Sequence, residues 1–148
     1  MKLKAENFLY IAWLQSVIAM LGSLFFSEIM HFPPCILCWY QRIAMYPLVA
    51  ILLVGMIKKT KEIAFYVLPL SIIGWLIALY HNLLYFRILP ESIQPCIQGV
   101  SCTTKFFALF GFITIPLLSL IAFSVINICI IMYLKMTSPK SFFQKLFR

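Results

Sequence analysis

Long apolar runs divide the chain into four segments that carry no charged side chain. These runs cover residues 7–27, 43–57, 63–86 and 106–134. A helix needs about 20 predominantly apolar residues to cross a bilayer, and the second run reaches that length when it is extended back to Cys35. Strands of membrane barrels are shorter and alternate apolar with polar residues. The pattern therefore predicts four membrane-spanning helices.

The polar segments between these runs set the expected helix bounds. We expect helices at about residues 8–29, 39–57, 63–86 and 111–134, and outer loops at about 30–38 and 87–110. The first segment has a basic end like that of a signal peptide. It is too long for one, however, and no small-x-small cleavage site follows it, so we interpret it as a retained first helix. Residues 1–148 are predicted to form one all-α integral membrane domain, a four-helix bundle.

Composition supports the same class of protein. Hydrophobic residues make up 64% of the chain and charged residues 11%, whereas a soluble domain is typically about half apolar and about a quarter charged. This difference excludes an ordinary soluble domain and a disordered chain.

Lysine and arginine are distributed unequally between the two ends of the expected helices. Three lie on the side of the outer loops, namely Arg42, Arg87 and Lys105. The other nine lie at the opposite ends, at Lys2, Lys4, Lys58, Lys59, Lys61, Lys135, Lys140, Lys145 and Arg148. Cytoplasmic loops are enriched in these residues, so we expect both termini in the cytoplasm and both outer loops on the extracytoplasmic face. The net charge of +8 is then mostly a topology signal, and we expect no nucleic-acid partner.

Four of the five cysteines fall in the two outer loops, as the pairs Cys35–Cys38 and Cys96–Cys102. The oxidising outer face of a membrane is where disulfides form and persist. The fifth, Cys129, lies within the last apolar run and is expected to be a small buried apolar residue. The two outer pairs indicate thiol–disulfide chemistry.

The first pair belongs to the motif Pro33-Pro34-Cys35-Ile36-Leu37-Cys38. The prolines end the first helix, and a cysteine at the N-terminus of the next helix has its thiolate stabilised by the helix dipole. Such a closely spaced pair can open and reclose by thiol exchange. The alternatives are a static disulfide, which adds little stability in so short a loop, or half of a zinc site.

Arg42 follows Cys38 by one helical turn on the same face of the predicted helix. Helical side chains lean toward the N-terminus, so the guanidinium is expected to point outward, toward Cys38. There it would stabilise a thiolate or an anionic acceptor. The alternative is an arginine that only anchors the helix at the interface.

The second pair, Cys96 and Cys102, has five residues between its members, among them Gly99. Functional residues are often found on loops, and we expect this pair to exchange with a partner protein; the alternative is a disulfide that only ties the loop.

Zinc sites usually space their paired cysteines by two to four residues. We therefore expect no metal site.

His81 lies near the outer end of the third predicted helix, at about the depth of Arg42. Polar groups inside a membrane are functional candidates, and an imidazole can shuttle a proton when a quinone or a thiol changes state. The alternative is an interfacial histidine between Tyr80 and Asn82.

With these motifs in place, the sequence resembles the DsbB family of membrane thiol oxidases, and among them the shorter BdbC-type members. The matching features are Pro34-Cys35-Ile36-Leu37-Cys38 followed by Arg42, the four-helix layout, and the stretch Cys96-Ile-Gln-Gly-Val-Ser-Cys102 followed by Gly111-Phe-Ile-Thr-Ile-Pro116. The resemblance covers almost the whole chain. The second pair is spaced much more widely in the longer proteobacterial members.

The resemblance implies a thiol:quinone oxidoreductase in the bacterial cell membrane. Its partner would be a secreted or membrane-anchored thioredoxin-like thiol oxidase, which forms a mixed disulfide with Cys96. Electrons would pass from the loop pair to Cys35–Cys38, and Cys38, the cysteine nearest Arg42, would face a membrane quinone. Menaquinone and ubiquinone both remain open as the acceptor, and we expect Arg42 and His81 to contact it.

Two other readings of the sequence remain. A vitamin K epoxide reductase-like protein also combines a loop pair with a C-x-x-C motif, but there the motif follows the loop pair in chain order, whereas here it precedes it. A non-enzymatic membrane assembly factor stapled by two disulfides would keep Cys35–Cys38 oxidised under all conditions.

Overall fold

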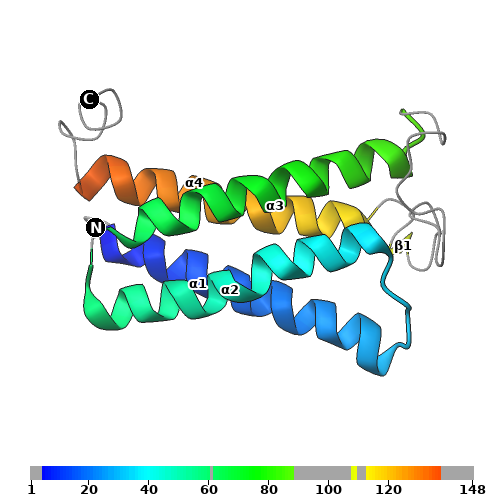
Figure 1. Cartoon of the computed structure of the whole chain (residues 1–148), viewed down its shortest axis with the longest axis horizontal. Helices are drawn as coiled ribbons and strands as arrows, with labels where there is room; N and C mark the ends of the chain where they lie inside the picture. Colours follow the sequence, from blue (N-terminus) through cyan, green and yellow to red (C-terminus); the bar gives the residue numbers. More distant parts are fainter. Residues whose placement is uncertain (1–4, 61, 89–107, 110–112, 138–148) are drawn as a thin grey trace.

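The computed structural model describes residues 5–60, 62–88, 108–109 and 113–137 of the chain. Four long helices dominate it (Figure 1). They are α1 (Ala5–Leu24), continued by the π-helical turn η1 (Phe25–Ile29), then α2 (Ile36–Lys58), α3 (Ile63–Tyr85) and α4 (Ile115–Thr137). Two-residue strands, β1 (Ala108–Leu109) and β2 (Ile113–Thr114), pair antiparallel just before α4. The predicted all-α four-helix bundle is confirmed.

The helices form a closed ring in which each packs against two neighbours. Helix α1 contacts α2 and α4, and α3 contacts the same two helices. The chain runs up and down, so α1 begins and α4 ends at the same end of the bundle, while α2, whose N-cap is Cys35, begins at the other end (Figure 1). Each helix is long and apolar enough to cross a membrane.

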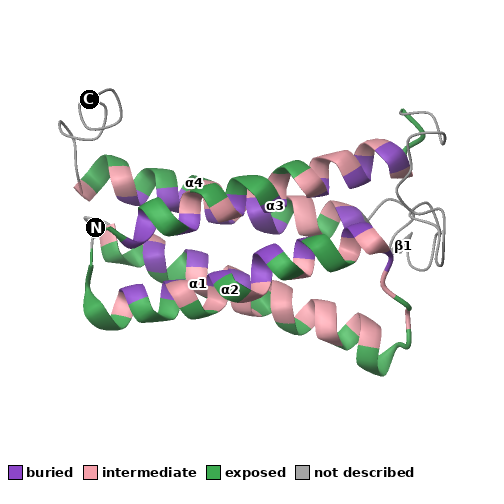
Figure 2. Cartoon of the chain, viewed as in Figure 1, coloured by how far each residue is buried: buried purple, intermediate pink, exposed green. Residues whose placement is uncertain are grey.

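Large apolar side chains cover the outside of the bundle as well as filling its core. Phe123, Leu48 and Ile126 are fully buried, whereas Ile57 and Tyr66 are mostly exposed on the outer surface. Figure 2 shows exposed and partly exposed positions on every helix, with buried positions facing the interior. A soluble monomer rarely exposes so much contiguous apolar surface, and lipid is the solvent that suits it. The protein is a multi-pass membrane protein.

Helices α3 and α4 approach each other closely at Gly74. A Cβ atom at this position would collide with the ring of Phe123. Small residues let membrane helices approach closely. The missing side chain of Gly74 thus decides where the Phe123 ring lies, and this ring also forms part of the functional cavity described below.

Three helix starts differ from the predicted bounds, and α4 ends at Thr137 rather than at residue 134. Helix α1 is described from Ala5 rather than residue 8, and α2 begins at Ile36 rather than residue 39 because Cys35 already serves as its N-cap. Helix α4 begins at Ile115, not near residue 111. There the Thr114 hydroxyl accepts a hydrogen bond from the backbone N–H of Leu117 (3.4 Å), which caps the helix start.

Candidate redox site

The two cysteines of the C-x-x-C motif meet at the start of α2. Cys35 is the N-cap, with an extended backbone, and its Sγ accepts a hydrogen bond from the backbone N–H of Cys38 (3.4 Å). The two Sγ atoms lie 3.0 Å apart, compared with about 2.05 Å in a disulfide. Both thiols are free, so the structure represents the reduced form of a pair that can close.

The surroundings of Cys35 favour its thiolate. The largest cause is the thiol of Cys38, which donates to Sγ of Cys35; a hydrogen bond and the positive charge of His81 add to it. These effects outweigh burial and lower the pKa of Cys35 from 9.0 to about 4. Depressed values of this kind are typical of reactive C-x-x-C cysteines. Stabilising the thiolate stabilises the reduced pair, which makes the disulfide a stronger oxidant.

His81 reaches this site from α3. Its side chain is buried, and Nε2 lies 3.8 Å from Sγ of Cys35. On the other side of the ring, Nδ1 lies 3.2 Å from Nε2 of the buried Gln41 on α2. In the neutral ring, with the amide in this orientation, Gln41 donates to Nδ1 and Nε2 carries the proton. In the charged ring both nitrogens carry protons, so Nδ1–H donates to the amide oxygen once the amide is turned over, and Nε2–H still faces the sulfur. Sequence reasoning missed Gln41, although an amide one turn after Cys38 on a membrane helix is a signal that could have found it.

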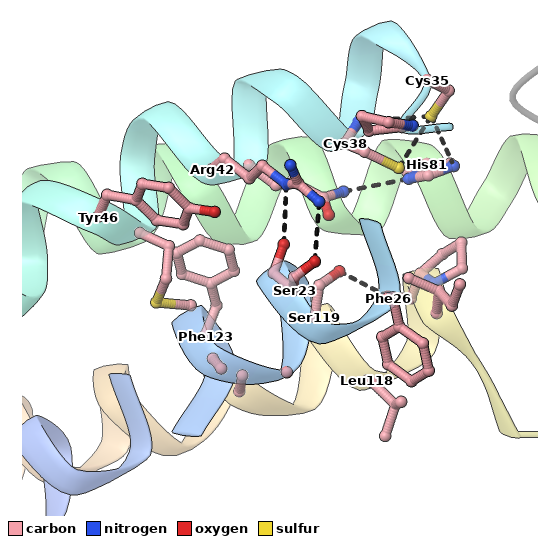
Figure 3. Close-up of a pocket in the computed structure, with 18 of the residues that line it drawn as sticks. Ser23, Phe26, Cys35, Cys38, Arg42, Tyr46, His81, Leu118, Ser119 and Phe123 are labelled. Carbon is pink, nitrogen blue, oxygen red and sulfur yellow. Dashed lines mark hydrogen bonds between the residues drawn. The ribbon is translucent and has the colours of Figure 1, made fainter. Parts of the chain in front are cut away.

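Arg42 makes a contact between helices that was not predicted. Its guanidinium reaches across to α1, where Nε donates to Oγ of Ser23 (2.8 Å) and a terminal nitrogen donates to its carbonyl oxygen (2.9 Å), as Figure 3 shows. The guanidinium also lies 5.5 Å from the centroid of the Trp39 ring. Ser23 belongs to the last turn of α1, where a carbonyl can take a side-chain donor. The sequence offered no signal for this contact between helices.

A cavity of about 290 Å³ opens beside these groups, between α1, α2 and α4. Both cysteines, Arg42 and His81 line it, so it unites four of the six predicted site residues. Most of its remaining wall is apolar, with Phe26, Met45 and Phe123 among its members. Its volume falls just below the range of about 300–1,000 Å³ for small-molecule pockets.

Tyr46 adds a polar group to the cavity that the sequence analysis did not identify. The residue lines the cavity one turn after Arg42, and its Oη is buried without a hydrogen-bond partner in the described part of the chain. In Figure 3 this hydroxyl points toward the Arg42 side of the site. Buried polar groups normally have a partner, so an unpaired hydroxyl here is suited to a ligand.

The remaining cysteines are Cys96, Cys102 and Cys129. Cys96 and Cys102, the predicted exchange pair, lie outside the described residues. Cys129 is buried in the core among side chains of the bundle, as predicted for a small apolar residue.

Comparison with known proteins supplies relatives over almost the whole chain. The family model described as "Disulfide bond formation protein DsbB" matches residues 5–133. "Disulfide bond formation protein C" of Bacillus subtilis is 51% identical over 121 residues, which are 82% of this chain and 88% of the relative. "Probable disulfide formation protein C" of Halalkalibacterium halodurans is 44% identical over 91% of this chain and 98% of its own. "Probable disulfide formation protein" of Metapseudomonas resinovorans is 40% identical over 90% and 93%, respectively. No solved structure matches the chain.

Proposed function

Because the chain belongs to the DsbB family of disulfide bond formation proteins, we propose that this oxidoreductase passes electrons from an extracytoplasmic thiol oxidase to a membrane quinone. The electron donor is a thioredoxin-like protein, either secreted or anchored to the membrane, which introduces disulfides into exported proteins and must then be re-oxidised. Menaquinone and ubiquinone are the two candidate acceptors.

One observation carries the proposal: the free thiols of Cys35 and Cys38 lie in the wall of an apolar cavity within a membrane bundle. A quinone is an apolar ring that dissolves in the bilayer, and a cavity with apolar walls and a few polar groups fits such a ring. The polar groups of the wall include Arg42 and the unpaired hydroxyl of Tyr46. They suit the two carbonyl oxygens of a quinone.

The electron balance assigns a task to each group. Oxidation of the Cys35–Cys38 dithiol to a disulfide releases two electrons and two protons, which are what reduction of a quinone to a quinol requires. His81, 3.8 Å from Sγ of Cys35, is placed to take up or release a proton. Arg42 places a positive charge in the same cavity, where it favours negative charge that develops on a quinone oxygen.

The donor side of the reaction belongs to Cys96 and Cys102. By analogy with the family, Cys96 takes the partner into a mixed disulfide, Cys102 is released as a thiol, and the reduced loop pair then passes its electrons to Cys35–Cys38. This route requires the cysteine end of the bundle to face the outside of the cell membrane, with both termini in the cytoplasm.

The test mixes the purified protein with a reduced thioredoxin-like partner and a quinone, and follows quinol formation. We expect activity in the unmodified protein and in Cys129→Ala, and none in Cys35→Ala or Cys38→Ala. Quinol formation in either C-x-x-C variant would show that electrons take another route. A Cys35–Cys38 pair that stays oxidised, with no quinol formed, would favour the disulfide-stapled assembly factor instead.

The order of exchange has its own test. A Cys102→Ala variant leaves Cys96 able to join an oxidised partner but without an internal thiol to resolve the complex, so a stable mixed disulfide should accumulate on a non-reducing gel. The matched variant Cys96→Ala should accumulate much less. An equal yield from both variants would overturn the assignment of Cys96 as the cysteine that meets the partner.

A further inference from the structure

The reduced site contains three metal-binding side chains that come from two helices. Sγ of Cys35, Sγ of Cys38 and the imidazole of His81 all lie within 4.8 Å of one another. Two thiolates and one imidazole form a donor set that zinc and other soft divalent ions prefer. The four loop cysteines by themselves predicted no metal site, and His81 is separated from Cys38 in the chain by most of two helices.

The spacing of the donor atoms is close to that of a tetrahedral site. Zinc–sulfur bonds of about 2.3 Å and zinc–nitrogen bonds of about 2.0–2.1 Å imply roughly 3.8 Å between two sulfurs and roughly 3.6 Å between sulfur and nitrogen. The distance from Sγ of Cys35 to Nε2 of His81 is 3.8 Å, and the two sulfurs are 3.0 Å apart. The sulfurs would have to separate by somewhat less than 1 Å. A rotation of the Cys38 side chain, which is only partly buried, can provide this separation.

Charge and access also favour an ion at this place. The two thiolates cancel the charge of a divalent cation, so the complex adds no net charge beside Arg42. All three donors line the cavity, which leaves a fourth coordination position for water or a small anion on the cavity side. Sites with three protein ligands and one open position are common for zinc.

Gln41 can hold His81 in the tautomer that a metal requires. An ion at Nε2 needs the proton on Nδ1, and Nδ1 lies 3.2 Å from the Gln41 amide. Rotation of that amide by half a turn brings its oxygen to the same place, where it accepts from Nδ1–H. Ligand histidines usually have such an outer partner.

We propose that the reduced protein binds one thiophilic divalent cation, Zn²⁺ or Cd²⁺, through Cys35, Cys38 and His81. Coordination transfers no electrons, and any thiol still protonated releases its proton. A disulfide has no thiolates to offer, so metal binding and oxidation of the pair exclude each other. Bound metal therefore holds the pair reduced and blocks its reaction. The blockage rests on the proposed function, whereas the binding does not.

The binding test uses the full chain in detergent with Cys96, Cys102 and Cys129 changed to serine, so that only the site thiols remain. Cd²⁺ is titrated into the reduced protein, and the ultraviolet thiolate-to-cadmium charge-transfer band is followed. We expect one Cd²⁺ per chain and no band after oxidation of the pair. A reduced protein that binds no Cd²⁺ would overturn the proposal.

Variants of His81 test whether the imidazole is a third metal ligand beside the two thiolates. We expect His81→Ala to weaken Cd²⁺ binding by about tenfold or more, and His31→Ala, the matched control at the other and exposed histidine, to leave it unchanged. His81→Cys should restore tight binding with a stronger charge-transfer band, because it adds a third thiolate; a merely structural role of His81 would not produce this gain. Equal affinity in His81→Ala and the unmodified protein would refute the three-ligand site.

A separate measurement addresses the blockage. Zn²⁺ should inhibit quinone reduction by the unmodified protein when it is added to the reduced state, and a chelator should restore the rate. Cd²⁺ binding without any quinone reductase activity would contradict the proposed function and leave the site intact. Quinone reductase activity in a protein that binds no metal would refute the metal site and leave the proposed function intact.

Discussion

Nε2 of His81 lies 3.8 Å from Sγ of Cys35, although 46 positions separate the two residues in the chain. Cys35 is the N-cap residue of α2, and His81 lies in the last turns of α3. The contact joins the most reactive sulfur of the site to a group that can accept or donate a proton, and it exists only because α2 and α3 pack side by side.

This contact predicts the pH dependence of Cys35 alkylation. Because the pKa of Cys35 is lowered to about 4, its thiolate and its reaction rate with iodoacetamide should be nearly constant above pH 6 and fall as the pH drops toward 4. His81→Ala removes a hydrogen bond and a charge that lower this pKa, so the midpoint should rise by about one unit or more. The rates are measured on the reduced protein with Cys96, Cys102 and Cys129 changed to serine. The same midpoint in His81→Ala and in His31→Ala would contradict the prediction.

The pairing of Arg42 with Ser23 predicts graded effects on quinone reduction. Arg42→Ala should raise the apparent KM for quinone or lower kcat by about tenfold or more, because a charged donor is lost from the cavity. Ser23→Ala removes one of the two acceptors that orient the guanidinium and should have a smaller effect of about threefold. Both variants should still form the mixed disulfide with the partner. If Arg42→Ala reduces quinone as well as the unmodified protein does, Arg42 is only an anchor at the interface.

The unpaired hydroxyl of Tyr46 predicts that binding and stability respond differently to its removal. Tyr46→Phe should raise the apparent KM for quinone by about fivefold, which corresponds to the free energy of one neutral hydrogen bond. It should not lower the melting temperature of the quinone-free protein in detergent, because the hydroxyl has no partner there in the described structure. Tyr40→Phe, an exposed position on the same helix, is the control for both measurements. A loss of stability without a change in KM would assign Tyr46 a purely structural role.

The close approach at Gly74 predicts that a single methyl group disturbs both packing and the cavity. Gly74→Ala pushes against the Phe123 ring and should lower the free energy of unfolding by about 1–3 kcal/mol, as overpacking does. Since Phe123 lines the cavity, the apparent KM for quinone should rise as well. The stability control is Gly22→Ala, where a Cβ meets nothing within 4 Å. A Gly74→Ala protein as stable as the unmodified one would show that the ring moves aside without cost.

The distribution of Lys and Arg predicts the orientation in the membrane. Reporter fusions at Lys59 and at the C-terminus should give cytoplasmic signals, and a fusion at Gln98 should give an external one. An external signal at Lys59 would place the cysteine end of the bundle in the reducing cytoplasm and would contradict the redox assignment.

The apolar pattern by itself determined the class of fold. In lipid, a run of about 20 apolar residues must satisfy its backbone hydrogen bonds internally, and a helix does so. Four helices could therefore be predicted without knowledge of their packing. The start of α4 was less predictable. It depends on the hydrogen bond between Thr114 and Leu117, and the hydropathy of the sequence does not show where such a capping bond forms.

The redox pair could also be read from the sequence, because Cys35 and Cys38 are neighbours on one helical turn and their chemistry is local. Arg42 and His81 could be named as candidates in the same way, but their contacts could not be predicted. The contact of His81 with Cys35 and the direction of Arg42 toward Ser23 depend on how α3 and α1 pack against α2. Helix packing depends on side-chain shape across the bundle, such as the gap that Gly74 leaves for Phe123, and a one-dimensional pattern does not contain that information. The sequence thus determined which groups are present, and the tertiary structure decided which of them meet.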